Sequence, residues 1–115
     1  INGGYALMSH LEILLADKLT TAGFPPAERE FKFSPDRKWR FDLAWDAHRI
    51  PVESGGGVWN GGRHTRPVGF QADIEKYNAA TLAGWDLYRV TGTMIANGQA
   101  LKLIESALTN AMAGQ

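Results

Sequence analysis

Cysteine is absent from the 115-residue chain, so disulfide bonds and thiolate metal sites are excluded. The same absence permits an intracellular, cytoplasmic protein. No apolar run approaches the roughly 20 residues that a membrane-spanning helix needs, and no secretory signal opens the chain. We therefore expect a soluble protein with no membrane partner.

An excess of charge of either sign is also lacking. Lysine plus arginine and aspartate plus glutamate number 12 each, so the net charge gives no indication of a nucleic-acid partner. The distribution is uneven, because basic side chains dominate residues 29–40 and residues 61–70 contain no acid at all. A phosphate backbone responds to the local potential, so a neutral protein can still present a basic face.

The remaining composition, 44% hydrophobic and 21% charged, is typical of one folded domain, here residues 1–115. Apolar periodicity with glycine and proline breaks predicts elements in the order αβββαβα. Their ranges are a helix starting near Ser9 and ending at Gly23, strands at 29–33, 39–45 and 50–53, a helix at 68–83, a strand at 85–90 and a helix at 98–113. A helix before the last strand makes a parallel crossover the simplest connection, so we expect an α/β fold with a mixed four-stranded sheet flanked by helices.

Each predicted helix has an apolar stripe at helical spacing. The stripes are Leu7, Leu11, Leu14, Leu15 and Leu19 in the first helix, Phe70, Ile74, Tyr77 and Thr81 in the second, and Leu101, Ile104, Leu108 and Met112 in the third. We expect these side chains to be buried against the sheet.

Two acids stand in neighbouring apolar strands. Strand alternation places Asp42 on the face opposite Phe41 and Leu43, where a carboxylate is costly unless something binds it. An ion pair with one of the nearby arginines, at 37, 40 or 49, is the simpler alternative. Glu53 ends the next strand, just before three glycines, and a hairpin would set it beside Asp42. Two adjacent carboxylates repel each other, and Mg²⁺ prefers such a pair together with water and phosphate oxygens.

These motifs, taken in order, resemble a known family. The matching stretches are residues 33–45, Val52-Glu53, Gly56 to Trp59, Gly62-Arg63-His64-Thr65-Arg66, Gly69-Phe70, Asp73 to Asn78 and Gly84-Trp85. Together they are similar to small phage and prophage proteins of the PD-(D/E)XK nuclease superfamily, with the layout of very-short-patch repair endonucleases and archaeal-type Holliday junction resolvases. The resemblance implies a restriction-endonuclease-like three-layer core and a cytoplasmic location in a bacterial host.

The resemblance also implies that Asp42 and Glu53 are metal ligands. The chain departs from the family pattern at Gly55, where a lysine or a further acid is usual. Lys76, on the second helix, is the candidate to replace it by orienting or activating the attacking water. An exposed salt bridge of little energetic value is the alternative for this lysine.

Two further residues acquire candidate roles from the resemblance. Glu12 of the first helix is a possible third metal ligand, although Ser9 and Glu12 also have the spacing of a helix capping box. His64 suits contact with the scissile phosphate or protonation of the leaving oxygen. A surface histidine without a task is its alternative.

The implied activity is that of a magnesium-dependent DNA endonuclease, with Mn²⁺ as a substitute metal and branched DNA such as a Holliday junction as the favoured substrate. Expected DNA contacts are Arg63, Arg66, Lys32, Lys38 and Arg40. A chain of this size covers little DNA, so we expect a homodimer. A nicking enzyme for mismatched duplex is one alternative, and a catalytically impaired DNA-binding module, which Gly55 favours, is another.

Overall fold

The structure is a computed structural model, and it describes residues 3–55 and 67–114 of the chain. The elements are the helix α1 (Gly3–Thr21), the strands β1 (Glu28–Lys32) and β2 (Arg40–Trp45), the 3₁₀ turn η1 (Asp46–His48), the strand β3 (Ile50–Ser54), the helix α2 (Pro67–Leu82), the strand β4 (Tyr88–Val90), and the helices α3 (Gly92–Ala96) and α4 (Gln99–Ala113). The predicted order is confirmed, apart from the short α3, which was not predicted. None of the described helices combines the length and apolar character required to cross a membrane.

The strands form one mixed sheet in the order β1-β2-β3-β4. β1 with β2 and β2 with β3 run antiparallel, whereas β3 and β4 run parallel. The parallel pair confirms the crossover that the helix between these strands predicted. A mixed four-stranded sheet with flanking helices is therefore the architecture of this chain.

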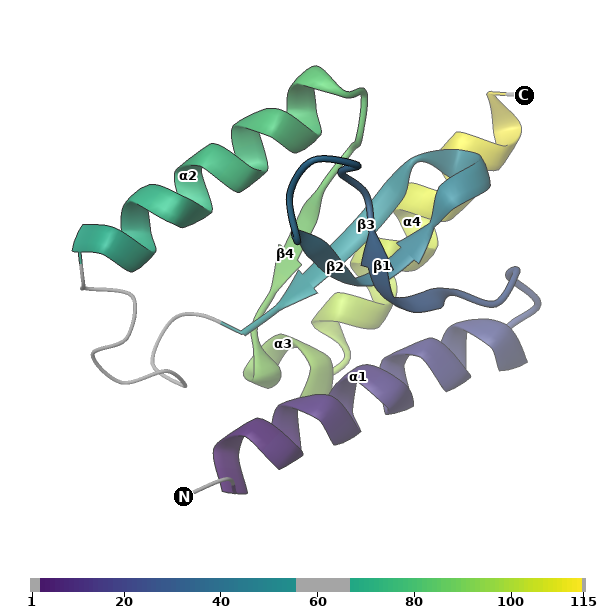
Figure 1. The fold of residues 1–115 in the computed structure, drawn as a ribbon. Coiled ribbons are helices and arrows are strands. Elements are labelled where there is room, and N and C mark those ends of the chain that lie inside the picture. Colours follow the sequence, from purple (N-terminus) through teal and green to yellow (C-terminus); the bar gives the residue numbers. More distant parts are fainter. Residues whose placement is uncertain (1–2, 56–66, 115) are drawn as a thin grey trace.

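Helices cover both faces of the sheet, and the two faces are packed differently (Figure 1). α1, α3 and α4 lie on one side, where they form the main core with the strands; its most buried members include Leu15, Leu19, Leu43, Ile104 and Leu108. On the other side α2 packs over a smaller, mostly aromatic cluster of Phe41, Ala44, Ala80 and Trp85. The larger core holds three helices, and the smaller one holds a single helix.

The predicted apolar stripe of the second helix is wrong in its described part. Ile74 is 39% exposed and Thr81 is exposed, whereas Ala80 is fully buried and Lys76 and Tyr77 are half-buried. α2 thus turns a partly polar face toward the sheet. The reason is that the strands below it carry a carboxylate, so a lysine occupies a position that apolar periodicity would have assigned to a hydrophobic residue.

The start of the first helix is also corrected. α1 begins at Gly3, so Ser9 lies inside the helix and cannot be the cap of a Ser9–Glu12 capping box. Leu11, Leu15 and Leu19 are buried as predicted, but Leu14 is 38% exposed. Glu12, with 8% exposure, is among the buried residues. Its burial needs an explanation other than helix capping.

Strict alternation in β2 is interrupted at Asp42. Phe41 packs in the cluster beneath α2, whereas Leu43 packs in the main core, although alternation predicted one face for both. In the ladder with β1, Arg29 pairs with Leu43 and Phe31 with Phe41, but Glu30, which would stand opposite Asp42, has a positive φ of 51°. This left-handed residue breaks the regular pleat on the neighbouring strand. As a result, Asp42 has no partner residue in the register between β1 and β2.

Candidate active site

Asp42 and Glu53 meet where β2 and β3 stop pairing through their backbones. The ladder runs from Trp45–Ile50 to Leu43–Val52, and Asp42 and Glu53 would be the next pair. Instead, the backbone N–H of Asp42 donates to Glu53 Oε2 at 3.0 Å, and the backbone N–H of Ser54 donates to Asp42 Oδ2 at 2.8 Å. The backbone N–H groups of Asp42 and Ser54 are therefore hydrogen-bonded to side-chain carboxylates instead of to backbone carbonyls of the neighbouring strand. The predicted juxtaposition of the two acids is confirmed.

Lys76 reaches Glu53 from α2. Its Nζ lies 2.5 Å from Glu53 Oε1, and the two side chains are 16% and 9% exposed, respectively. The pair is therefore not the exposed salt bridge that was the alternative for this lysine. Burial, and secondarily the charge of Asp42, raises the pKa of Glu53 to about 7, although Lys76 acts in the opposite direction. A carboxylate at this position is tolerated only with a nearby cation.

Gly55 occupies the position where the related motif carries a lysine or acid. Its φ is 100°, in the region that favours glycine, and its N–H donates to the Val90 carbonyl at 3.1 Å. This residue continues the contact between β3 and β4 with its backbone. The cationic group of the site is supplied by Lys76, 23 residues from Glu53 along the chain.

Asp42 has a second carboxylate oxygen that is available. Oδ2 accepts hydrogen bonds from the N–H and the hydroxyl of Ser54, whereas Oδ1 accepts none from any residue in the part of the chain that the structure describes. The proposed alternative, an arginine partner, is absent among these residues as well: Arg37 pairs with Glu75 and Arg49 with Asp46. The half-buried Asp42 carboxylate is therefore stabilised by Ser54 and not by an ion pair.

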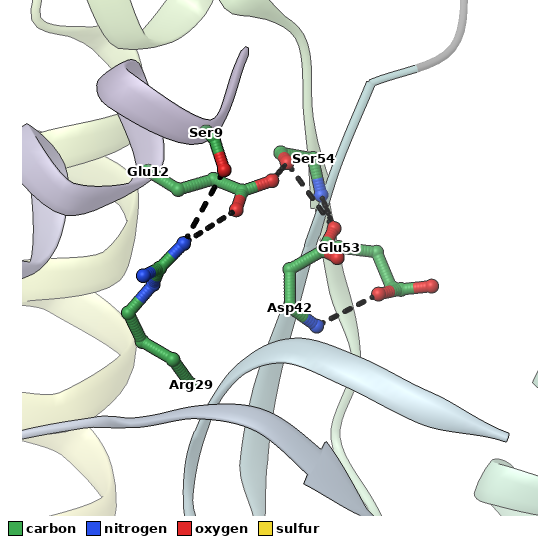
Figure 2. Close-up of polar contacts among 6 residues, drawn as sticks. All are labelled: Ser9, Glu12, Arg29, Asp42, Glu53 and Ser54. Carbon is green, nitrogen blue, oxygen red and sulfur yellow. Dashed lines mark hydrogen bonds and ion pairs between the residues drawn. The ribbon is translucent and has the colours of Figure 1, made fainter. Parts of the chain in front are cut away.

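Ser54 connects Asp42 to Glu12 of α1 (Figure 2). Its hydroxyl lies within hydrogen-bond distance of Glu12 Oε2 and 3.1 Å from Asp42 Oδ2. A hydroxyl has one hydrogen and donates to only one of two carboxylates. Burial raises the pKa of Glu12, with the Ser54 hydrogen bond opposing the shift. A protonated Glu12 can donate to Ser54, which then donates to Asp42, so this arrangement satisfies all three groups.

Arg29 closes the α1 side of the site. Its guanidinium lies 3.8 Å from Glu12 Oε1 and donates to the Ser9 hydroxyl at 3.4 Å (Figure 2). A cavity of about 110 Å³ opens here, lined by Met8, Ser9, Glu12, Arg29, Glu30 and Asp42. A space of this size accommodates water molecules beside the Asp42 carboxylate.

Tyr77 borders the other side of Lys76. Its ring centroid is 5.8 Å from Lys76 Nζ and 4.6 Å from the guanidinium carbon of Arg89. Burial, and then the charge of Glu53, raises the pKa of Tyr77 to about 12, so its hydroxyl is neutral at physiological pH. Two cations thus share one aromatic ring beside Glu53.

Ser54, Tyr77 and Arg89 were not predicted as members of the site. Strand alternation was the available signal for Ser54, because a residue next to Glu53 must point to the opposite face and so toward α1. Nothing in the local sequence indicates the other two, since their proximity depends on how α2 lies across β4.

The predicted DNA-contacting residues are only partly described. Arg63, His64 and Arg66 lie outside the described residues. Lys32, Lys38 and Arg40 are exposed, and Lys32 and Arg40 are partners in the β1–β2 ladder, so two cations stand side by side on adjacent strands. Lys32 and Arg40 thus form a basic pair at the end of the β1–β2 ladder.

The fit of a metal ion can be judged from the donor set. Within residues 3–55 and 67–114, no group of three or more His, Cys, Asp or Glu side chains is placed to hold one. The pair Asp42 and Glu53 remains, with one available Asp42 oxygen and an adjacent cavity lined in part by that residue. Mg²⁺ often takes only one or two carboxylates and fills its other positions with water and phosphate oxygens. Asp42 Oδ1 fits that requirement as it stands, whereas Glu53 would have to give up its hydrogen bond to Lys76 or to the Asp42 N–H in order to bind a metal. Glu12 is linked to the pair through Ser54.

Comparison of the chain with models of known protein families, with curated proteins and with solved structures finds no match.

Proposed function

We propose that this protein is a metal-dependent DNA endonuclease of the PD-(D/E)XK type. The observation that carries the proposal is the meeting of Asp42, Glu53 and Lys76 at the point where β2 and β3 diverge. A buried carboxylate beside a second carboxylate is costly for stability, and burial together with the charge of Asp42 raises the pKa of Glu53 to about 7. Perturbed groups of this kind are enriched at catalytic sites.

Asp42 and Glu53 are the residues that would hold Mg²⁺ or Mn²⁺. A bound divalent metal polarises a phosphoryl oxygen and lowers the pKa of a coordinated water. Lys76 takes the place of the missing lysine near Gly55. Its ammonium group pairs with Glu53. In this proposal it also orients the attacking water. Ser54 and Glu12 fix the orientation of the Asp42 carboxylate, since Ser54 donates twice to Oδ2 and leaves Oδ1 for a ligand.

The substrate proposed is DNA, with branched DNA such as a Holliday junction as the preferred form. The exposed Lys32, Lys38 and Arg40 support backbone contact, and Arg63, His64 and Arg66 are proposed to extend it. A homodimer would give two such sites for a substrate with two-fold symmetry.

The test is a cleavage assay with labelled four-way junction, linear duplex and single strand, each with Mg²⁺, Mn²⁺ or chelator. Asp42→Asn, Glu53→Gln and Lys76→Met should each abolish or strongly reduce cleavage. Glu75→Gln, one residue from Lys76 on the exposed side of α2, is the matched control and should cleave normally. Cleavage that persists in Asp42→Asn would refute the site assignment.

One observation favours the alternative of an inactive DNA-binding module. Both Glu53 oxygens already accept hydrogen bonds, from the Asp42 N–H and from Lys76. If these bonds persist, Glu53 is a structural residue. Titration with Mn²⁺, monitored through the relaxation enhancement of water protons, distinguishes the nuclease from the inactive module. A nuclease should bind Mn²⁺, and its Asp42→Asn variant should not. An inactive module should show no specific Mn²⁺ site.

A further inference from the structure

Arg89 lies beside the candidate active site on the face of the sheet that α2 covers. Its backbone partner in the parallel ladder between β3 and β4 is Glu53. Paired residues on adjacent strands project to the same face. Glu53 contacts Lys76 of α2, and Arg89 lies over Tyr77 of the same helix, so both contacts agree with this orientation.

The guanidinium of Arg89 differs from three other described arginines in what it contacts. Arg29, Arg37 and Arg49 each have a carboxylate oxygen within 4.0 Å. Arg89 has no such partner among residues 3–55 and 67–114, and its recorded contact there is the face of the Tyr77 ring, 4.6 Å from the guanidinium carbon. A ring face occupies none of the five N–H donors that arginine carries. Arg89 is also exposed, so the edges of its guanidinium can reach a ligand.

The neighbouring lysine does not duplicate this property. Lys76 lies 5.8 Å from the centroid of the same ring, but its charge is neutralised by Glu53 at 2.5 Å. Arg89 therefore supplies a positive charge on this flank of the site, and no residue of 3–55 or 67–114 occupies its donors. Planar guanidinium groups bind phosphate through two parallel hydrogen bonds.

We propose that Arg89 binds a backbone phosphate of DNA adjacent to the Asp42–Glu53 pair, with the Tyr77 ring as the platform that orients the guanidinium. The proposal deepens the proposed function, on which it rests for the identity of the ligand. Arg89 is a substrate-positioning residue in this scheme. Its guanidinium would contact the DNA and not the metal, although its backbone is the ladder partner of Glu53.

The experiment measures DNA binding in chelator, so that no cleavage occurs, as a function of salt concentration. The variants are Arg89→Gln, Arg89→Lys and the matched control Arg49→Gln. Arg49 is likewise an exposed arginine stacked on an aromatic ring, 4.1 Å above Trp85, but it pairs with Asp46 and precedes β3, at the end remote from Glu53. Both glutamine variants remove one positive charge. Thermal unfolding of each variant establishes that it is folded.

Arg89→Gln should bind duplex or junction about tenfold more weakly, and the slope of log affinity against log salt should fall by about 0.9, the value for one lost phosphate contact. Arg89→Lys should keep the slope and lose part of the affinity. Arg49→Gln should change neither. Equal effects of the two glutamine variants, no effect of Arg89→Gln, or absence of DNA binding by the unsubstituted protein would overturn the proposal.

Cleavage measured separately with Mg²⁺ distinguishes this proposal from the proposed function. Binding that depends on Arg89 without any cleavage supports the phosphate contact and counts against the nuclease. Cleavage by the unsubstituted protein together with unchanged binding by Arg89→Gln supports the nuclease and rejects the role of Arg89.

Discussion

Replacement of Glu53 by glutamine should stabilise the protein at alkaline pH, although Glu53 belongs to the candidate active site. The native pKa of this carboxyl is raised from 4.5 to about 7, mainly by burial. The native state therefore binds its proton more tightly than the unfolded state does. The free energy of unfolding falls as the pH rises from about 4.5 through about 7, and this loss is complete above pH 7.

The magnitude follows from the width of that interval. Each pH unit corresponds to roughly 1.4 kcal/mol per proton, so the change from 4.5 to about 7 amounts to about 3 kcal/mol. Glutamine is neutral at every pH and has nearly the shape of a protonated glutamate. Glu53→Gln should therefore match the unsubstituted protein near pH 4 and exceed its unfolding free energy by about 3 kcal/mol at pH 8. Groups common to both proteins cancel in this difference.

The assay is urea unfolding, followed by tryptophan fluorescence, from pH 4 to pH 8 in the presence of chelator. Glu75→Gln removes an exposed carboxylate from α2 and should show a difference from the unsubstituted protein that varies little with pH. Addition of Mg²⁺ at pH 8 should then stabilise the unsubstituted protein, by about 2.7 kcal/mol at one hundred times the dissociation constant, but not Glu53→Gln. A pH-independent difference, or a Glu53→Gln protein that is less stable at pH 8, would refute the reasoning.

Three further predictions concern Lys76, Ser54 and the packing of the helices. Lys76→Met should raise the pKa of Glu53 above its native value, because the charge of Lys76 lowers that pKa. Carbon-detected NMR titration of the Glu53 carboxyl measures the change. An unchanged pKa would mean that the ion pair does not persist in solution. Ser54→Ala should lower the free energy of unfolding in urea by about 1–3 kcal/mol at pH 8 and by less at pH 5, because it removes the hydrogen-bond partner of the buried Glu12. An equal loss of unfolding free energy at both pH values would argue against the link to Glu12. Ile104→Ala should lower the free energy of unfolding by about 2–5 kcal/mol, because its side chain is fully buried, whereas Ile74→Ala should change it by no more than about 0.5 kcal/mol. Equal losses would mean that Ile74 is buried, as the predicted apolar stripe of the second helix required.

The sequence was sufficient to predict the strands, the mixed sheet and the meeting of Asp42 with Glu53. Those features depend on local alternation and on the short connection between two adjacent strands, which is η1 in the structure. Each of these inferences needs only residues that are close in sequence, or one regular period. Lys76 was a candidate because of the family resemblance, and its contact with Glu53 agrees with that candidate role.

Inferences that depended on irregular backbone or on distant packing were wrong or missing. The left-handed Glu30 interrupts the sheet opposite Asp42, and no local pattern around it predicts this conformation. The stripe of α2 was misplaced because the position of Lys76 is determined by a charge on another element. Arg89 was overlooked for the same reason, since its contact with Tyr77 joins a strand and a helix that the crossover brings together.

The residues of the candidate site lie on both faces of the sheet, and the two faces differ in how much buried core they contain. Asp42, Ser54 and Glu12 are linked by hydrogen bonds on the side of the sheet that α1 covers, whereas Lys76 belongs to α2, whose buried side chain among those that the structure describes is Ala80. Helices with little buried apolar surface open at lower free energy than the rest of a domain. We therefore expect amide hydrogens of α2 to exchange with solvent before those of α1, so that the ammonium group separates from Glu53 in a local opening while the carboxylates keep their positions. Access of a bulky ligand to these carboxylates would then depend on this local opening of α2, with no need for global unfolding.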